Sequence, residues 1–127
     1  MADPVADLTT RLLEKALDCT AVQHRVAIGN LANLETPGYT ARRVTFEDRL
    51  RVALRAEERG GDPRGLRRVT AEVTARTDAA GPDGNNVNVE TEMLAVGEAS
   101  LRYQVITRML DRKLEMVGIA IGDGRSA

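Results

Sequence analysis

A helical pattern ends within Gly29-Asn30-Leu31-Ala32-Asn33-Leu34-Glu35-Thr36-Pro37-Gly38-Tyr39-Thr40-Ala41, and this stretch decides the fold. Proline disfavours the α region for the residue before it, so the helix has to stop by Thr36. Pro37 and Gly38 suit the central pair of a type II turn, in which the glycine takes a positive φ. We expect the chain to leave this turn as a short extended piece, residues 40–46.

Before the turn, residues 6–34 are predicted to form one long helix. Small, polar and apolar side chains recur four and three residues apart, which is a heptad seam. The seam is Leu13, Leu17, Thr20, His24, Ala27, Leu31 and Leu34. A second stripe runs beside it through Leu12, Ala16, Cys19, Gln23, Val26 and Asn30. Together they form a face wide enough for more than one partner.

At the other end of the chain, residues 89–121 are predicted to form a second long helix. Asn88 is a good N-cap, and Gly122 is expected to end the helix. Its apolar positions recur every three or four residues: Val96, Ala99, Tyr103, Ile106, Leu110, Leu114, Val117 and Ile121. The intervening sequence is too poor in large apolar residues to cover both helices. The predicted fold is therefore mainly α, an antiparallel coiled-coil hairpin with an irregular, partly extended middle.

The middle, residues 47–88, has the weakest pattern. Residues 47–58 suit a short helix, which Gly60-Gly61-Asp62-Pro63 breaks. Apolar and polar residues alternate over 69–76, as in a short strand, and residues 80–86 have the composition of a loop. We expect this middle to be mobile unless a partner orders it.

The composition suits helix packing rather than a thick core. The chain has 127 residues, 43% of them hydrophobic but only 2% aromatic, so Ala, Val and Leu carry most of the apolar content. The net charge of −1 gives no global attraction to nucleic acid. Residues 41–68 nevertheless hold nine arginines against five acids. This basic segment either steers neighbouring subunits or is a solvated face.

Catalytic and metal chemistry finds little support. One cysteine, Cys19, and one histidine, His24, exclude an internal disulfide and a Cys/His metal site. A Ser/His/Asp grouping would need His24 with Ser100 or Ser126, yet His24 lies on an apolar stripe. Phosphate-binding glycine loops are absent. We predict no enzyme activity, cofactor, metal or small-molecule substrate. We also see no secretory signal and no membrane-spanning run.

Residues 29–41 closely resemble the signature of the flagellar basal-body rod family, Asn-x-Ala-Asn-x-x-Thr-Pro-Gly-Tyr, with every defined position present. The following residues 42–47 look like the continuation typical of the FlgB branch. Residues 85–93 and 101–104 are similar to the start of the family's terminal helix. Residues 102–104 and 107–110 look more like FlgB than FlgC. The resemblance covers about residues 8–50 and 84–121.

The resemblance implies a structural subunit of the proximal rod, which polymerises through its terminal helices into the tube that drives the motor. It implies one rod-type domain over 1–127: a helix over 6–34, a turn and extended segment over 35–46, a variable middle over 47–88 and a helix over 89–121. Export would use the flagellar type III apparatus without a cleaved signal peptide. Expected partners are FlgC, FlgF and FlgG type subunits, FliE, the MS ring and the export gate. The alternatives are a FlgC-type subunit or a helical adaptor or chaperone of the export system.

We expect assembly to depend on ten residues: Asn30, Asn33, Thr36, Pro37, Gly38, Tyr39, Phe46, Tyr103, Gln104 and Leu110. The amides of Asn30 and Asn33 either bond backbone across a subunit contact or cap the helix end locally. Tyr39 and Phe46 either anchor on a neighbour or pack within the subunit. Tyr103 and Gln104 are expected in the helix–helix seam.

Overall fold

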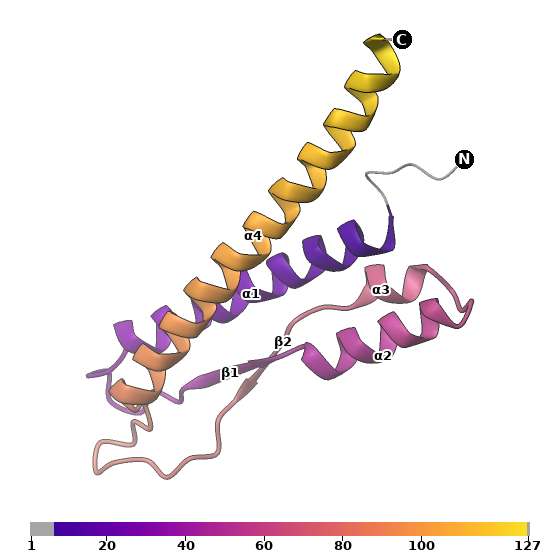
Figure 1. Ribbon diagram of the computed structural model, residues 1–127. Coiled ribbons are helices and arrows are strands. Elements are labelled where there is room, and N and C mark those ends of the chain that lie inside the picture. The colour runs from indigo at the N-terminus through magenta and orange to yellow at the C-terminus, as the bar shows by residue number, and fades with distance from the viewer. Residues whose placement is uncertain (1–6, 127) are drawn as a thin grey trace.

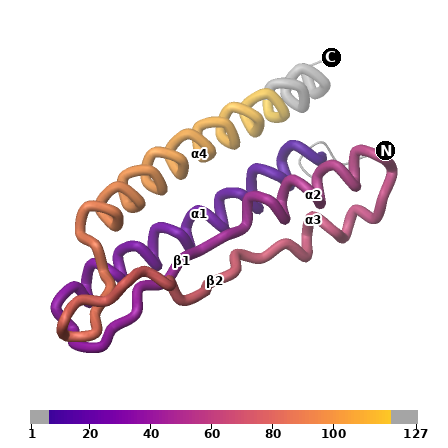
Figure 2. The backbone as a smooth tube through the Cα atoms, turned by 90° about the horizontal axis from the view of Figure 1, so that it is seen from below, coloured from indigo at the N-terminus to yellow at the C-terminus, as the bar shows by residue number. Residues whose placement is uncertain are grey.

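The computed structural model describes residues 7–126, and the side chains of residues 7–118. Figure 1 shows two long helices at the chain ends and a smaller middle. The order is α1 (Leu8–Ala32), β1 (Arg42–Thr45), α2 (Glu47–Glu58), α3 (Arg64–Arg68), β2 (Glu72–Ala75) and α4 (Val89–Ser126). Helices α1 and α4 lie side by side and antiparallel (Figures 1 and 2). The predicted mainly α fold with paired terminal helices is confirmed.

The predicted ends of the two helices differ from the structure by a few residues. The start at residue 6 lies outside the described residues, and α1 ends at Ala32. Helix α4 continues to Ser126 and passes the glycines that we expected to stop it. Glycine costs a helix interior only about 1 kcal/mol, so by itself it does not end one.

The seam between α1 and α4 is built from small and medium side chains. Buried seam residues of α1 include Leu13, Thr20 and Ala27. On α4, Ala99 and Ile106 are buried and lie seven residues apart, on one face. The side chains at a contact set how closely two helices approach, so Thr20 and Ala27 suit a close pairing.

The second stripe of α1 is covered by the chain itself. Cys19 is buried in a cluster with Phe46, Leu50, Leu66 and Val69. Leu12 and Ala16 pack against this cluster. Figure 2 accordingly shows α1 between α4 on one side and α2 and α3 on the other. The intervening segment thus covers one stripe of α1 with four apolar residues, and it does not cover both helices, as we expected.

The middle segment folds back on itself through a two-stranded ribbon. Strands β1 and β2 are antiparallel, with Arg42 opposite Ala75 and Val44 opposite Val73. Helix α2 spans the residues predicted as a short helix, and β2 lies within the predicted alternating stretch. The mobility of this segment in the isolated chain stays a prediction.

An ion pair links the start of α1 to α4. The Asp7 side chain caps α1 by accepting from the Thr10 backbone N–H at 2.8 Å. Its other oxygen lies 2.7 Å from Nζ of Lys113 on α4. The hydrogen bond from Lys113, followed by that from Thr10, lowers the pKa of Asp7 to about 2.

The Leu66→Ala variant tests whether the middle segment, residues 47–88, is packed in the isolated chain. Leu66 is 1% exposed, so its truncation should lower the free energy of unfolding by about 2–4 kcal/mol. Val52→Ala, at a position 68% exposed, is the control and should change it by under about 0.5 kcal/mol. Urea unfolding of the monomer gives both values. Equal, small effects would mean that the middle is unpacked in the monomer.

A pH titration tests the link between Asp7 and Lys113. Because the folded pKa of Asp7 lies below the unfolded value, its stabilising contribution is complete above about pH 4 and is lost between about pH 4 and pH 2. Lys113→Met should raise the pKa of Asp7 toward the ordinary carboxyl range. NMR of the carboxyl carbon reports it directly. An ordinary pKa for Asp7 in the unchanged protein would contradict the contact.

Candidate assembly site

The turn after α1 rests directly on the loop before α4. Gly38 has φ of 73°, and the Tyr39 N–H donates to Thr36 O at 3.2 Å, which confirms the predicted turn. The Gly38 N–H donates to Asp83 O at 2.8 Å. A Cβ on Gly84, whose φ is 80°, would lie 3.3 Å from the Gly38 Cα. Two glycines therefore let segments that are distant in sequence meet backbone to backbone.

Asn85 caps the end of α1 from a loop 52 residues further along the chain than Asn33. Its Nδ2 lies 2.8 Å from Asn33 O, 3.0 Å from Leu34 O and 2.8 Å from Thr36 O. The amide has only two hydrogens, so these three carbonyls share them. The carbonyls of Asn33 and Thr36 also accept from backbone N–H groups, those of Thr36 at 3.1 Å and Tyr39 at 3.2 Å. Asn85 therefore adds a side-chain donor to the end of α1 and to the turn that follows it.

Asn86 joins the same loop to the start of β1. Its Oδ1 accepts from the Ala41 N–H at 2.6 Å, and its backbone N–H donates to Tyr39 O at 3.3 Å. The next polar residue, Asn88, accepts from the Thr91 N–H at 3.0 Å and begins α4 as predicted.

Asn30 completes the junction from α1 and is 1% exposed. Its Nδ2 donates to Arg42 O at 2.9 Å and to Glu92 Oε2 at 3.0 Å. Its Oδ1 accepts from the Arg42 N–H at 3.0 Å and from the Tyr39 hydroxyl at 3.1 Å. All four hydrogen bonds of this amide are made within the chain. We call Asn30, Asn85 and Asn86 the asparagine clasp.

The two predicted asparagines thus act differently. Neither alternative considered for Asn30 describes its bonds, because the structure uses them to join β1 and α4 to α1. Asn33 caps locally, since its Nδ2 donates to Gly29 O at 2.8 Å.

Glu92 carries a buried charge beside the clasp. The residue is 3% exposed on α4, and its Oε1 lies 3.0 Å from Nη1 of Arg76. Arg76 also pairs with Asp78. Removing one partner of a buried ion pair leaves an uncompensated charge, so Arg76 and Asn30 together keep Glu92 in place.

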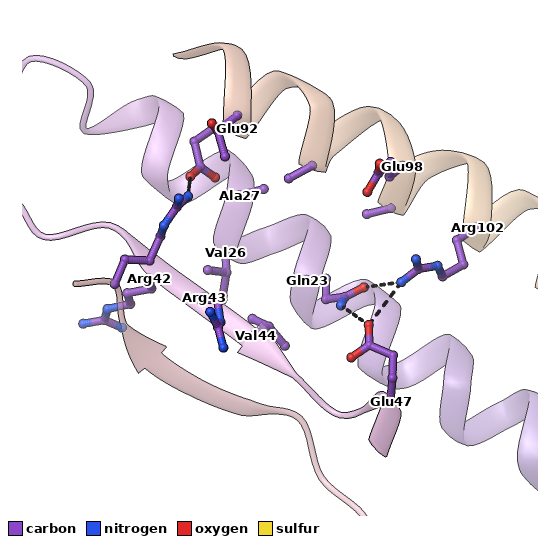
Figure 3. A pocket seen from close by; sticks show the side chains of 14 residues that line it. Gln23, Val26, Ala27, Arg42, Arg43, Val44, Glu47, Glu92, Glu98 and Arg102 are labelled. Atoms are coloured by element: carbon purple, nitrogen blue, oxygen red, sulfur yellow. Dashed lines mark hydrogen bonds and ion pairs between the residues drawn. The ribbon is translucent and has the colours of Figure 1, made fainter. Parts of the chain in front are cut away.

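A second polar contact joins α4, α1 and α2 at a cleft of about 200 Å³ (Figure 3). The Gln23 side chain on α1 donates to Glu47 Oε1 at 3.0 Å and accepts from Arg102 on α4 at 3.1 Å. Arg102 also lies 3.4 Å from Glu47 at the start of α2. Burial favours the neutral form of Glu47, but the backbone N–H groups of Glu47 and Phe46, then Gln23 and Arg102, outweigh it and lower its pKa.

Tyr103 and Gln104 lie outside the buried seam. Both are exposed and line a groove of about 540 Å³ on the other edge of the α1–α4 pair. Tyr103 precedes the buried Ile106 by three residues, which turns it about 60° from the seam. Leu110 is half-buried. The same groove brings His24 near Ser100, and no carboxylate is among the described residues that line it.

The remaining predicted residues lie around the turn. Phe46 is 4% exposed in the core, so it packs within the subunit. Tyr39 is half-buried and bonds Asn30, while Thr36 and Pro37 are exposed.

Comparison with known proteins gives three consistent relatives, although no family model matches the sequence. The Bacillus subtilis (strain 168) protein is 27% identical over 123 residues, covering 92% of this chain and 95% of the relative. The Escherichia coli (strain K12) protein is 29% identical over 126 residues, covering 86% and 89%. The Borrelia hermsii protein is 25% identical over 132 residues, covering 92% and 98%. Each is named flagellar basal body rod protein FlgB.

The chain is similar to FlgB proteins over most of its length. These relatives favour FlgB over the FlgC alternative. Within the part of the chain that the structure describes, no helix is long and apolar enough to cross a membrane.

Sequence reasoning missed four residues of the junction: Asn85, Asn86, Arg76 and Glu92. A signal existed for two of them, since three asparagines fall within residues 85–88 directly before α4. No local pattern marks Arg76 or Glu92, because each acquires its role only when β2 and α4 meet α1.

Asn85→Asp tests the clasp with little change of shape. A carboxylate cannot donate, so the three carbonyls lose this side-chain donor and face a negative charge instead. The free energy of unfolding at pH 7 should therefore fall by about 2–3 kcal/mol. Asn88→Asp is the matched control. It keeps a good N-cap acceptor and should be nearly neutral. Urea unfolding compares them, and equal losses would show that Asn85 has no special role.

Proposed function

We propose that the chain is a structural subunit of the bacterial flagellar basal-body rod, and that α4 packs against other subunits to build the rod. Similarity to FlgB proteins supports the rod, because these relatives bear the name of flagellar basal body rod proteins. The observation that carries the role of α4 is a row of exposed apolar residues along it.

This row, the outer stripe, consists of Leu94, Leu101, Val105, Met109 and Met116, which are 47–63% exposed. Leu94 and Leu101 follow the buried Glu92 and Ala99 by two residues, about 200° around the helix. The stripe thus faces away from α1. Contiguous exposed apolar surface of this kind marks an interaction site.

The geometry of the stripe favours an open assembly. Helix α1 is covered on both sides within the chain, while α4 is covered on one side only. A subunit that presents one apolar face and binds with a different face makes head-to-tail contacts, which give rings or helical tubes. A drive shaft built from such contacts requires no catalytic group, and we assign none.

Partners follow from the proposed location. In the basal-body rod, the neighbours of this subunit would be FlgC, FlgF and FlgG type subunits, FliE, the MS ring and the export gate. Export would use the flagellar type III apparatus. Tyr103, Gln104 and Leu110 lie beside the seam, where a neighbour's helix would meet the α1–α4 pair. The asparagine clasp contributes by holding the two helices at a fixed angle.

Val105→Glu tests the outer stripe. Val105 is 47% exposed, so the monomer should unfold within about 0.5 kcal/mol of the unchanged protein. A charge buried in a subunit contact is costly, so the variant should fail to enter basal bodies in cells that lack the native subunit. Motility and immunoblots of purified basal bodies are the measurements. Val105→Met keeps an apolar side chain and should assemble. Normal assembly of the Val105→Glu variant would show that the outer stripe is not needed for assembly.

A further inference from the structure

Helices α2 and α3 form a shallow groove of about 440 Å³ on the side of the molecule opposite α4. Small residues line it, among them Ala53, Ala56 and Gly65. Val52 also lines the groove and is 68% exposed. Because Val52 follows the buried Leu50 by two residues, it lies about 200° around the helix and points away from α1. The groove is thus an open apolar surface that no element of the subunit covers.

The edge of this groove carries an exposed arginine. Asp48 pairs with Arg51, and Arg49 pairs with Glu72. Arg68 is exposed and makes no direct ion pair among the described residues, although its charge also acts on Asp62. Arginine suits carboxylates especially well, because its planar fork can bind both oxygens. A partner for the groove should therefore combine apolar side chains with an acid.

The first three turns of α4 present such a surface. Glu90, Leu94, Glu98 and Leu101 follow one another four, four and three residues apart, so they form one ridge. Leu94 and Leu101 are each 63% exposed. Both glutamates are exposed, and neither makes an ion pair among the described residues. Glu98 lies at the edge of the ridge and also borders the cleft between α4 and α1 (Figure 3). The ridge and α2 each span twelve residues, about 18 Å.

We propose that the groove between α2 and α3 receives the ridge of α4 from a second copy of this chain, with Arg68 facing Glu98 across the contact. This inference rests on the proposed rod function and names one partner surface for the outer stripe. Helix α1 lies between α4 on one side and α2 and α3 on the other (Figure 2), so the ridge and the groove belong to different sides of the subunit. The contact is therefore heterologous and leaves a free groove and a free ridge at the two ends of every pair.

Cysteine cross-linking tests the pairing of the two surfaces. In a Cys19→Ala background, molecules with Val52→Cys are mixed with molecules with Leu101→Cys at high protein concentration under mild oxidation. A disulfide-linked heterodimer is expected. Ile28→Cys, 45% exposed on α1, replaces Val52→Cys in the control and should give at least about tenfold less product. Equal yields from the two, or no heterodimer, would overturn the proposal.

A charge exchange tests the polar part of the contact. Arg68→Glu and Glu98→Arg should each reduce the heterodimer yield several-fold, because each places like charges together. The double variant restores opposite charges and should recover most of the yield. Arg108→Glu, a charge change on α4 outside the ridge, is the control. A double variant that is weaker than both single variants would contradict the facing of Arg68 and Glu98.

Basal bodies separate this inference from the proposed function. If the chain is found in purified basal bodies but Val52→Cys and Leu101→Cys do not link there, the contact is wrong and the rod role stands. If the link forms with purified protein and the chain is absent from basal bodies, the contact stands and the rod role fails.

Discussion

The three carbonyls at the end of α1 depend on one side-chain amide, that of Asn85. Without it, the Leu34 carbonyl would lose its donor, and the carbonyls of Asn33 and Thr36 would keep only their backbone partners. An unsatisfied acceptor is costly in a part-buried site. The rest of the junction follows from this bond, because the loop that carries Asn85 also places Asn86 on β1 and begins α4 at Asn88. The seam between the helices has too few large side chains to set the alignment of the two helices alone. It buries small residues, and the Thr20 hydroxyl has no partner among the described residues.

This arrangement divides the surfaces of the two long helices unequally. Helix α1 is enclosed, with α4 along one stripe and the cluster around Phe46 and Leu66 along the other. Helix α4 has only α1, so its opposite face stays apolar and exposed. The surface available to other subunits is thus on α4 and on the outer side of α2 and α3. The conspicuous turn at Pro37 and Gly38 serves the fold of the subunit by directing β1 back along α1.

Much of the fold could be predicted because it is encoded locally. Heptad spacing marks both long helices, Asn88 marks the start of α4, and Pro37-Gly38 specifies a turn with a positive φ at Gly38. The covering of Cys19 by Leu66 and Val69 could not be predicted, because these residues lie about 50 positions away in a segment with a weak pattern. The candidate site divides in the same way. Asn30 and Tyr39 stood out by their motif, yet their partners Arg42, Glu92 and Arg76 are determined only by how β1, β2 and α4 meet.

The contact of Gln23 with Glu47 and Arg102 has a mechanical consequence. It binds α4, α1 and α2 to one another at a level seven residues, or about 10 Å, along α1 from the clasp. Two contacts at different levels restrict the relative movement of the helices more than one contact does, because a helix can still rotate about a single contact. The contact therefore gives a force on the exposed side of α4 a path through α1 to the start of α2.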